Sequence, residues 1–201
     1  MKVHSFSTYT LASNSYVLSS DGEYAIIDPS IPYDDIITKL PEKEASFKYI
    51  ILTHAHFDHM LYINEWKEKT GAEVIVGLKD KDKLSDSYGN CYQFFFGKND
   101  GYFGEARAVS EGEELILGKE KLKIYESPGH TSGSILILFG DNLFVGDTVF
   151  ADGGIGRTDL PSGNTETLFR SIERIRSFPK HLSVYSGHGR KTSIKEINQT
   201  I

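Results

Sequence analysis

Short apolar runs that are typical of β-strands recur along the whole chain. They lie at residues 14–18, 23–27, 47–53, 72–76, 115–117, 122–125, 134–139, 142–145 and 182–185. Many of them are rich in the β-branched and aromatic residues that favour strands. Asp21-Gly22 separates the first two runs and is a strong hairpin signal. We also expect hairpins across residues 118–120 and 140–141, and an edge strand at residues 3–10, where the alternation is looser.

Four segments are predicted to be helical: residues 34–40, 60–70 and 165–178, and the stretch that follows Ser193. Residues 60–70 are amphipathic and end at Gly71, as helices commonly do. A proline stops each of the helices at residues 34–40 and 165–178. Ser193 and Glu196 have the spacing of a capping box. Strands that alternate with helices, followed by a strand-rich second half, predict a mixed α/β sandwich.

Residues 79–109 depart from this pattern. The charged run at residues 79–86 predicts a solvated helix. Six aromatic residues then fall within residues 92–103, among turn-forming glycines. Two interpretations stay open for them: a hydrophobic plug under a long loop, or the wall of a substrate pocket or a dimer contact. The adjoining Cys91 is expected to be a small buried apolar residue.

Ionisable side chains are most densely clustered in Thr-His-Ala-His-Phe-Asp-His at residues 53–59. Three histidines and one aspartate follow the predicted strand 47–53, at the carboxyl end where α/β folds place their sites. Neutral imidazole and carboxylate are ligands that zinc and iron accept. Because buried polar groups without partners are costly, this cluster predicts a metal site.

Three further candidate ligands follow or interrupt predicted strands. His130 lies in a Pro-Gly-His turn, Asp147 in Gly-Asp and His188 in Gly-His-Gly. Glycine lets the backbone turn sharply and brings each side chain close to a shared centre. Five of the seven histidines lie in these motifs, and only His4 and His181 lie outside them.

In this order, the motifs His-x-His-x-Asp-His, Gly-His, Gly-Asp and Gly-His-Gly resemble the metallo-β-lactamase-fold superfamily. Gly-Arg-Thr-Asp-Leu-Pro at residues 156–161 resembles its short glyoxalase II-like (hydroxyacylglutathione hydrolase-like) branch, and is also seen in persulfide dioxygenases. The resemblance runs from Asn14 to the last helix. It implies an α/β fold, a four-layer αββα sandwich of two mixed β-sheets flanked by helices, with residues 1–201 as a single domain.

The resemblance implies two divalent metal ions and seven ligands: His54, His56, Asp58, His59, His130, Asp147 and His188. One ion would bind His54, His56 and His130. The second would bind Asp58, His59 and His188, and Asp147 would bridge the pair. Two such cations about 3.5–4 Å apart share a water and lower its pKa toward neutrality. Zinc is the first expectation, and iron or manganese also suit this ligand set.

Asp58 is also the candidate catalytic residue, because a weakly bound carboxylate could orient the water or accept its proton. No serine or cysteine lies in a recognisable nucleophile elbow. Candidates for orienting the metal-bound imidazoles lie near the ligands in sequence: Thr53, Thr131, Thr148 and Asp159. Arg157 and Asp159 could instead form an internal ion pair that pins the glycine-rich loop at residues 151–164. Tyr16 is expected to be a strand residue.

Hydrolysis of a small thioester, as in glyoxalase II-like enzymes, is the function that the resemblance implies. Full-length glyoxalase II holds glutathione with a C-terminal helical segment, whereas ten residues follow Lys191 here. A shorter or different thiol carrier therefore stays open. Two alternatives are a mononuclear-iron persulfide dioxygenase that uses His54, His130 and Asp147, and a non-catalytic member that binds a metal or ligand.

Length, charge and cysteine content limit the classes of partner that we expect for this chain. The length of 201 residues suits one domain. The formal net charge of −6 disfavours nucleic-acid binding. With Cys91 as the single cysteine, no intrachain disulfide forms, which fits a reducing cytoplasm. Neither a signal-peptide pattern nor an apolar run of about 18 residues occurs, so we expect no membrane partner. A small-molecule thioester is the expected partner, and the chain is expected to be a monomer or homodimer.

Overall fold

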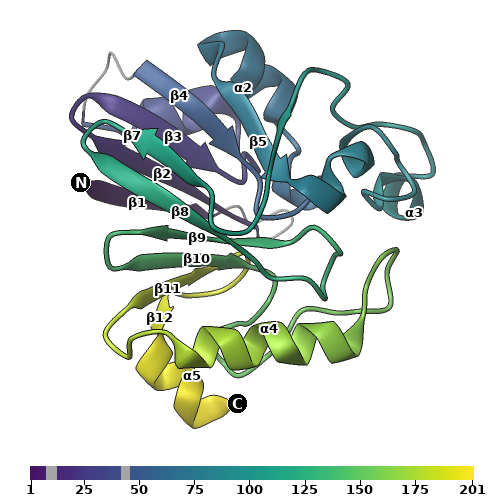
Figure 1. The fold of residues 1–201 in the computed structure, drawn as a ribbon. Coiled ribbons are helices and arrows are strands. Elements are labelled where there is room, and N and C mark those ends of the chain that lie inside the picture. The colour runs from purple at the N-terminus through teal and green to yellow at the C-terminus, as the bar shows by residue number, and fades with distance from the viewer. Residues whose placement is uncertain (8–12, 42–45) are drawn as a thin grey trace.

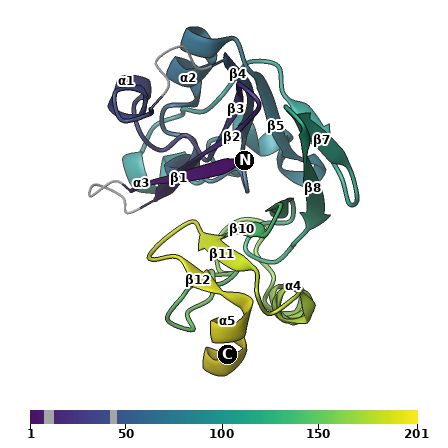
Figure 2. The same ribbon diagram turned by 90° about the vertical axis from the view of Figure 1, so that its left-hand side faces the viewer.

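The computed structural model describes residues 1–7, 13–41 and 46–201, and it shows two β-sheets packed face to face with helices on both outer faces (Figure 1). The view at 90° separates the same layers (Figure 2). Each sheet has six strands and is mixed. The expected four-layer αββα sandwich is therefore confirmed.

The first sheet has the strand order β1-β2-β3-β4-β5-β6. Its strands are β1 Lys2–Ser7, β2 Asn14–Ser20, β3 Glu23–Ile27, β4 Ser46–Ile51, β5 Glu73–Gly77 and β6 Arg107–Val109. Strands β1 to β3 are antiparallel, and β3 to β6 run parallel. The β2–β3 hairpin turns at Asp21 and Gly22, both with positive φ, as a tight hairpin turn requires. Residues 8–10 of the expected edge strand lie outside the described residues.

The second sheet has the order β12-β11-β10-β9-β8-β7. Its strands are β7 Glu114–Leu117, β8 Glu120–Glu126, β9 Ile135–Phe139, β10 Asn142–Gly146, β11 Ser183–Ser186 and β12 Thr192–Ser193. The hairpins expected at residues 118–120 and 140–141 form, although the first turn is shorter than expected. Only β10 and β11 pair in parallel. The short strands β6 and β12 carry too few residues to show a sequence pattern.

The helices are α1 Tyr33–Ile37, α2 Ile63–Thr70, α3 Tyr92–Phe96, α4 Thr165–Ser177 and α5 Ile194–Thr200. Helix α2 begins three residues later than expected, because the Tyr62 amide donates to the Pro29 carbonyl at 3.0 Å; a 3-10 turn, η1 Phe57–His59, lies just before this segment. Gly71 ends α2 with a φ of 66°, as expected. The Ser193 hydroxyl accepts a hydrogen bond from the Glu196 amide and caps α5.

Three apolar clusters hold the layers together. Between the sheets lie residues from both inner faces, such as Ile51, Phe139 and Phe144. Trp66 of α2 is fully buried against the first sheet, and its indole N–H donates to the Ile31 carbonyl at 2.8 Å. Helices α4 and α5 pack on the second sheet. Among the described residues, no helix is long and apolar enough to cross a membrane.

The predicted helix at residues 79–86 is wrong. This segment forms two 3-10 turns, η2 Leu78–Asp80 and η3 Asp82–Leu84. Asp80 and Leu84 are buried within it. The reason is that the Asp80 carboxylate accepts hydrogen bonds from two site loops, which a regular solvated helix would not allow.

Candidate metal centre

All seven candidate ligands gather at one edge of the sandwich, where several strands end. His54 and His56 follow β4, and Asp58 and His59 lie in η1 just beyond. The other three follow strands of the second sheet: His130 after β8, Asp147 after β10 and His188 after β11. The carboxyl ends of strands in both sheets therefore deliver the ligands to one place, as α/β folds do.

The histidines His54, His56 and His130 form the first group. Ligand atoms of all three lie within 4.8 Å of one another, and the three side chains are buried. His56 Nδ1 lies 2.9 Å from His130 Nε2. The grouping that the resemblance implied for one metal is therefore present in space.

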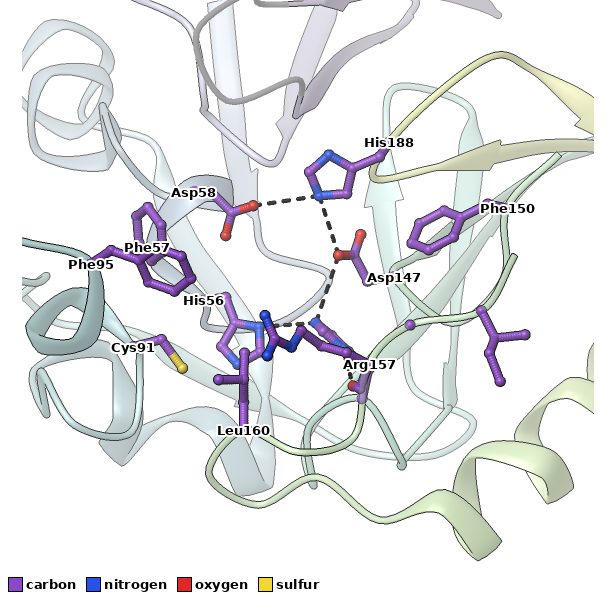
Figure 3. A pocket seen from close by; sticks show the side chains of 13 residues that line it. His56, Phe57, Asp58, Cys91, Phe95, Asp147, Phe150, Arg157, Leu160 and His188 are labelled. Atoms are coloured by element: carbon purple, nitrogen blue, oxygen red, sulfur yellow. Dashed lines mark hydrogen bonds and ion pairs between the residues drawn. The ribbon is translucent and has the colours of Figure 1, made fainter. Parts of the chain in front are cut away.

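Asp58, His59 and His188 form the second group, also within 4.8 Å. Asp147 lies between the two groups: its Oδ2 is 3.2 Å from His188 Nε2 and 3.7 Å from His130 Nε2 (Figure 3). Its Oδ1 is 3.4 Å from His59 Nε2. Asp147 therefore contacts side chains of both groups, and its ligand atom also lies within 4.8 Å of those of His54 and His59.

Four buried atoms in this cluster make no hydrogen bond with the described part of the chain: His54 Nε2, His56 Nε2, His59 Nε2 and Asp147 Oδ1. Buried polar atoms are nearly always satisfied, and leaving them without a partner is costly. Imidazole Nε2 and carboxylate oxygen are zinc and iron ligands. The residues present therefore fit a metal centre.

Electrostatics favours a cation here. Burial lowers the pKa of His54 far below its ordinary value and that of His56 to about 3, so both rings are neutral, as metal ligands must be. Burial would lower the pKa of His188, but hydrogen bonds with Asp147 and Asp58 raise it to about 10. Burial would raise the pKa of Asp58, but the neighbouring histidines hold it at about 2. The two carboxylates thus attract positive charge.

A residue that the sequence analysis did not single out, Asp28, orients His59. The Asp28 carboxylate lies 2.9 Å from His59 Nδ1 and accepts hydrogen bonds from the Thr53 amide and hydroxyl. Thr53 Oγ1 also lies 3.2 Å from His54 Nδ1, so this candidate does contact a ligand imidazole. Asp28 directly follows an apolar strand, as the ligands do, and that position was the available signal.

The other three candidates for orienting imidazoles contact other groups. Thr131 donates to Asp80, and Thr148 pairs with Ser127. Asp159 forms an exposed bidentate ion pair with Arg157 at 2.7 Å, so the expected pairing is confirmed but at the surface. It is the Arg157 backbone carbonyl, and not the Asp159 side chain, that contacts an imidazole: it lies 2.8 Å from His130 Nδ1.

Asp80 joins two of the ligand loops. Its carboxylate accepts from the Ala55 amide at 3.0 Å, between His54 and His56. It also accepts from the Thr131 hydroxyl at 2.7 Å and the Gly133 amide at 2.9 Å, just beyond His130. One buried side chain thereby sets the spacing of the first histidine group.

Tyr16 and Gly187 support the second group. Tyr16 is a buried strand residue, as expected, and its hydroxyl donates to the Ser186 carbonyl at 2.5 Å, next to the His188 loop. Glycine is required at position 187, because a Cβ there would lie 2.1 Å from Asp147 Oδ1. The chain can only pass this close to the carboxylate without a side chain.

A cavity of about 420 Å³ opens above the ligands. Apolar and partly apolar residues complete its lining: Phe57, Cys91, Phe95, Phe150, Ile155, Gly156, Arg157 and Leu160. Its volume lies in the range of small-molecule sites. Of the two interpretations of the aromatic segment, the pocket wall is therefore correct for Phe95.

Comparison with known proteins agrees with this site. The metallo-beta-lactamase superfamily model matches residues 8–188. The chain is 35% identical to the probable metallo-hydrolase YqgX of Bacillus subtilis, over 92% of this chain and 88% of that protein. It is 36% identical to the hydroxyacylglutathione hydrolase GloC of Haemophilus influenzae, over 90% of this chain and 86% of that protein.

Two solved structures share the fold over nearly the whole chain. The BLEG-1 B3 metallo-beta-lactamase superposes with a TM-score of 0.89 at 30% identity, covering 97% of this chain and 95% of that one. TTHA1623 in a di-iron-bound form gives a TM-score of 0.85 at 25% identity, covering 98% of each chain. The chain therefore belongs to the metallo-β-lactamase superfamily, as one of its metal-dependent hydrolases.

Proposed function

We propose that the protein hydrolyses a small thioester with two divalent metal ions held by the seven ligands described above. Zinc is the metal that we expect first. One observation carries the proposal. Two three-residue groups lie together with Asp147 close to both, and five of these seven side chains line a substrate-sized cavity: His56, Asp58, His130, Asp147 and His188. When bound, such a metal pair supplies a hydroxide at neutral pH and polarises the carbonyl.

The cavity offers no hydroxyl or reactive thiol for nucleophilic attack. Among the described residues that line it, none is a serine or threonine. Cys91 is the one thiol, and burial raises its pKa to about 11, so it stays protonated at neutral pH. This lining supports attack by water, which is the chemistry of a metal-dependent hydrolase.

Asp58 has the geometry for handling the proton of that water. Its side chain is 19% exposed, whereas the His59 side chain is fully buried, so Asp58 reaches the cavity. The Ser13 hydroxyl donates to Asp58 Oδ2 at 3.1 Å and His188 Nε2 lies 3.4 Å from the same atom. These contacts hold one carboxylate oxygen and leave the other to orient the water or accept its proton.

Two comparisons support a thioester substrate and a site for two metal ions. GloC, a hydroxyacylglutathione hydrolase by name, is 36% identical over 90% of this chain. TTHA1623 was solved with two irons in the same fold. A cytoplasmic location, a small-molecule partner and a monomeric or homodimeric state complete the proposal, and they rest on the sequence alone.

Two measurements test the proposal: the metal content of the protein, and its turnover of a panel of substrates. Protein purified without added metal is analysed for zinc, iron and manganese. It is then assayed against thioesters and a chromogenic β-lactam, since the similar protein BLEG-1 is a B3 metallo-beta-lactamase. About two metals per chain with thioester turnover supports the proposal. β-Lactam turnover alone would assign another substrate class, and metal binding without turnover would indicate a non-catalytic binder.

The persulfide dioxygenase alternative predicts a different result. It needs one iron on His54, His130 and Asp147, and it gives no role to the complete second group around Asp58. One iron per chain with persulfide-dependent oxygen uptake, and no thioester turnover, would replace the hydrolase proposal.

A further inference from the structure

The cavity above the metal centre is polar at its floor and apolar along its walls. The floor consists of ligand side chains, including His56, Asp58 and His188. Outside the ligand set, Arg157 is the only charged residue among the described residues of the lining, and Asp159 pairs with it at 2.7 Å. A polar substituent placed against these walls would therefore lose its hydrogen bonds to water without replacement.

Part of the cavity lining is buried. Phe57 and Cys91, at 5% and 1% exposure, form this part, and Phe95 lies beside them (Figure 3). Arg157, which also lines the cavity, is exposed. A thiol carrier must extend from the reacting carbonyl toward solvent, whereas the acyl group can end inside the protein. The acyl group therefore belongs against the buried, apolar part of the lining.

Helix α3 is fixed to the ligand loop by ring packing. The Phe57 ring, between His56 and Asp58 in sequence, lies 4.8 Å from the Phe95 ring and 5.3 Å from the Phe96 ring. This packing holds the Phe95 side chain at a fixed position relative to the ligands. Phe95 is nevertheless 55% exposed, so an apolar group in the cavity would gain by covering it.

We infer that the substrate carries an apolar acyl group, a hydrocarbon chain of several carbons, and that Phe95 determines this specificity. The inference rests on the proposed thioester hydrolysis and specifies its substrate class. The thioester carbonyl lies over the metal ligands, and the hydrocarbon chain lies between Phe95 and Leu160 with its end toward Cys91. A small hydroxyacyl group would place its hydroxyl against the same apolar walls.

The test uses N-acetylcysteamine thioesters, which share one small carrier. The acyl groups are acetyl, butanoyl, hexanoyl and 2-hydroxypropanoyl. For the metal-loaded protein, kcat/KM is expected to rise about fourfold for each added methylene that becomes buried. The 2-hydroxypropanoyl thioester is expected to be poorer than the butanoyl thioester. Ratios within one enzyme preparation do not depend on the fraction of active protein.

Phe94 provides a matched control for Phe95. Both lie on α3 and have nearly equal exposure, 54% and 55%, but Phe94 packs on Tyr88 at 5.1 Å and does not line the cavity. Phe95→Ala is expected to flatten the chain-length gradient at least fourfold between acetyl and hexanoyl. Phe95→Leu should restore most of it, and Phe94→Ala should retain the parent gradient.

The outcomes separate three failures. Turnover of the 2-hydroxypropanoyl thioester above the butanoyl and hexanoyl thioesters overturns the apolar acyl group while leaving thioester hydrolysis intact. Equal gradients in Phe95→Ala and Phe94→Ala overturn the role of Phe95. Absence of turnover on every thioester by protein with two bound metals overturns the proposed function, and this inference with it.

Discussion

Replacing Asp80 with asparagine should destabilise the protein strongly, although the change is isosteric. Each carboxylate oxygen accepts two hydrogen bonds: Oδ1 from the Gly133 amide and Lys83, and Oδ2 from the Ala55 amide and Thr131 hydroxyl. The amide group of asparagine would replace one oxygen by a donor. In either orientation, a buried backbone N–H loses its acceptor.

The size of the effect follows from these contacts. A buried, unsatisfied N–H costs about 1–3 kcal/mol, and the remaining bonds lose their charge assistance, about 1 kcal/mol each. With two bonds left on the retained oxygen, we expect a total loss of about 3–5 kcal/mol in the free energy of unfolding. Since small domains have only about 5–15 kcal/mol in total, such a loss is large.

Urea unfolding measures this loss. Trp66 is the single tryptophan and is fully buried, so its fluorescence follows the core. Curves are taken in chelator, to remove metal effects, for the parent, Asp80→Asn and the exposed neighbour control Asp82→Asn. The control should stay within about 0.5 kcal/mol of the parent. A loss below about 1 kcal/mol in Asp80→Asn would refute the reasoning.

The same substitution should weaken metal binding. Asp80 ties the loop of His54 and His56 to the loop of His130, so its change loosens the first ligand group. Residues that orient metal ligands typically contribute 10–100-fold in affinity. Zinc titration with a competing chelator measures this, and an unchanged affinity would show that the loops hold their spacing without Asp80.

Three further predictions concern the site. Asp58→Ala should lower kcat at least 100-fold with little change in urea midpoint, because its side chain reaches the cavity; an unaltered rate would contradict its role. Elemental analysis should find less bound metal in Gly187→Ala than in the parent, since the new Cβ meets Asp147 Oδ1 at 2.1 Å; an unchanged metal content would contradict this role of Gly187. Because burial raises the Cys91 pKa to about 11, iodoacetamide should alkylate it about 100-fold more slowly at pH 8 than in urea; equal rates would show an accessible thiolate.

Local signals in the sequence predicted most elements. Asp21-Gly22 forms the expected turn because both residues adopt positive φ at little cost. Ser193 caps the last helix because its hydroxyl reaches an amide three residues on. The ligand motifs follow strands, and strand ends converge at one edge of the sandwich. These features depend on neighbours in sequence, and the resemblance then assigned the ligands to two metals.

The errors lie where distant contacts override local preference. Residues 79–86 carry the charges of a solvated helix, yet Asp80 turns inward to amides that are 25 and 53 residues away. Helix α2 starts late because the Tyr62 amide donates to the carbonyl of Pro29, a residue distant in sequence, and not to a helical carbonyl. No local pattern contains this information.

The sequence by itself determined the α/β class, the hairpins and which histidines and aspartates would cluster, because side-chain chemistry and turn preferences are local. The tertiary structure decided which groups orient those side chains and what shape lies above them. Asp28 contacts His59 across 31 residues, and Phe95 meets Phe57 across the cavity wall. Such pairings depend on how the two sheets pack, so they arise only once the whole core has formed.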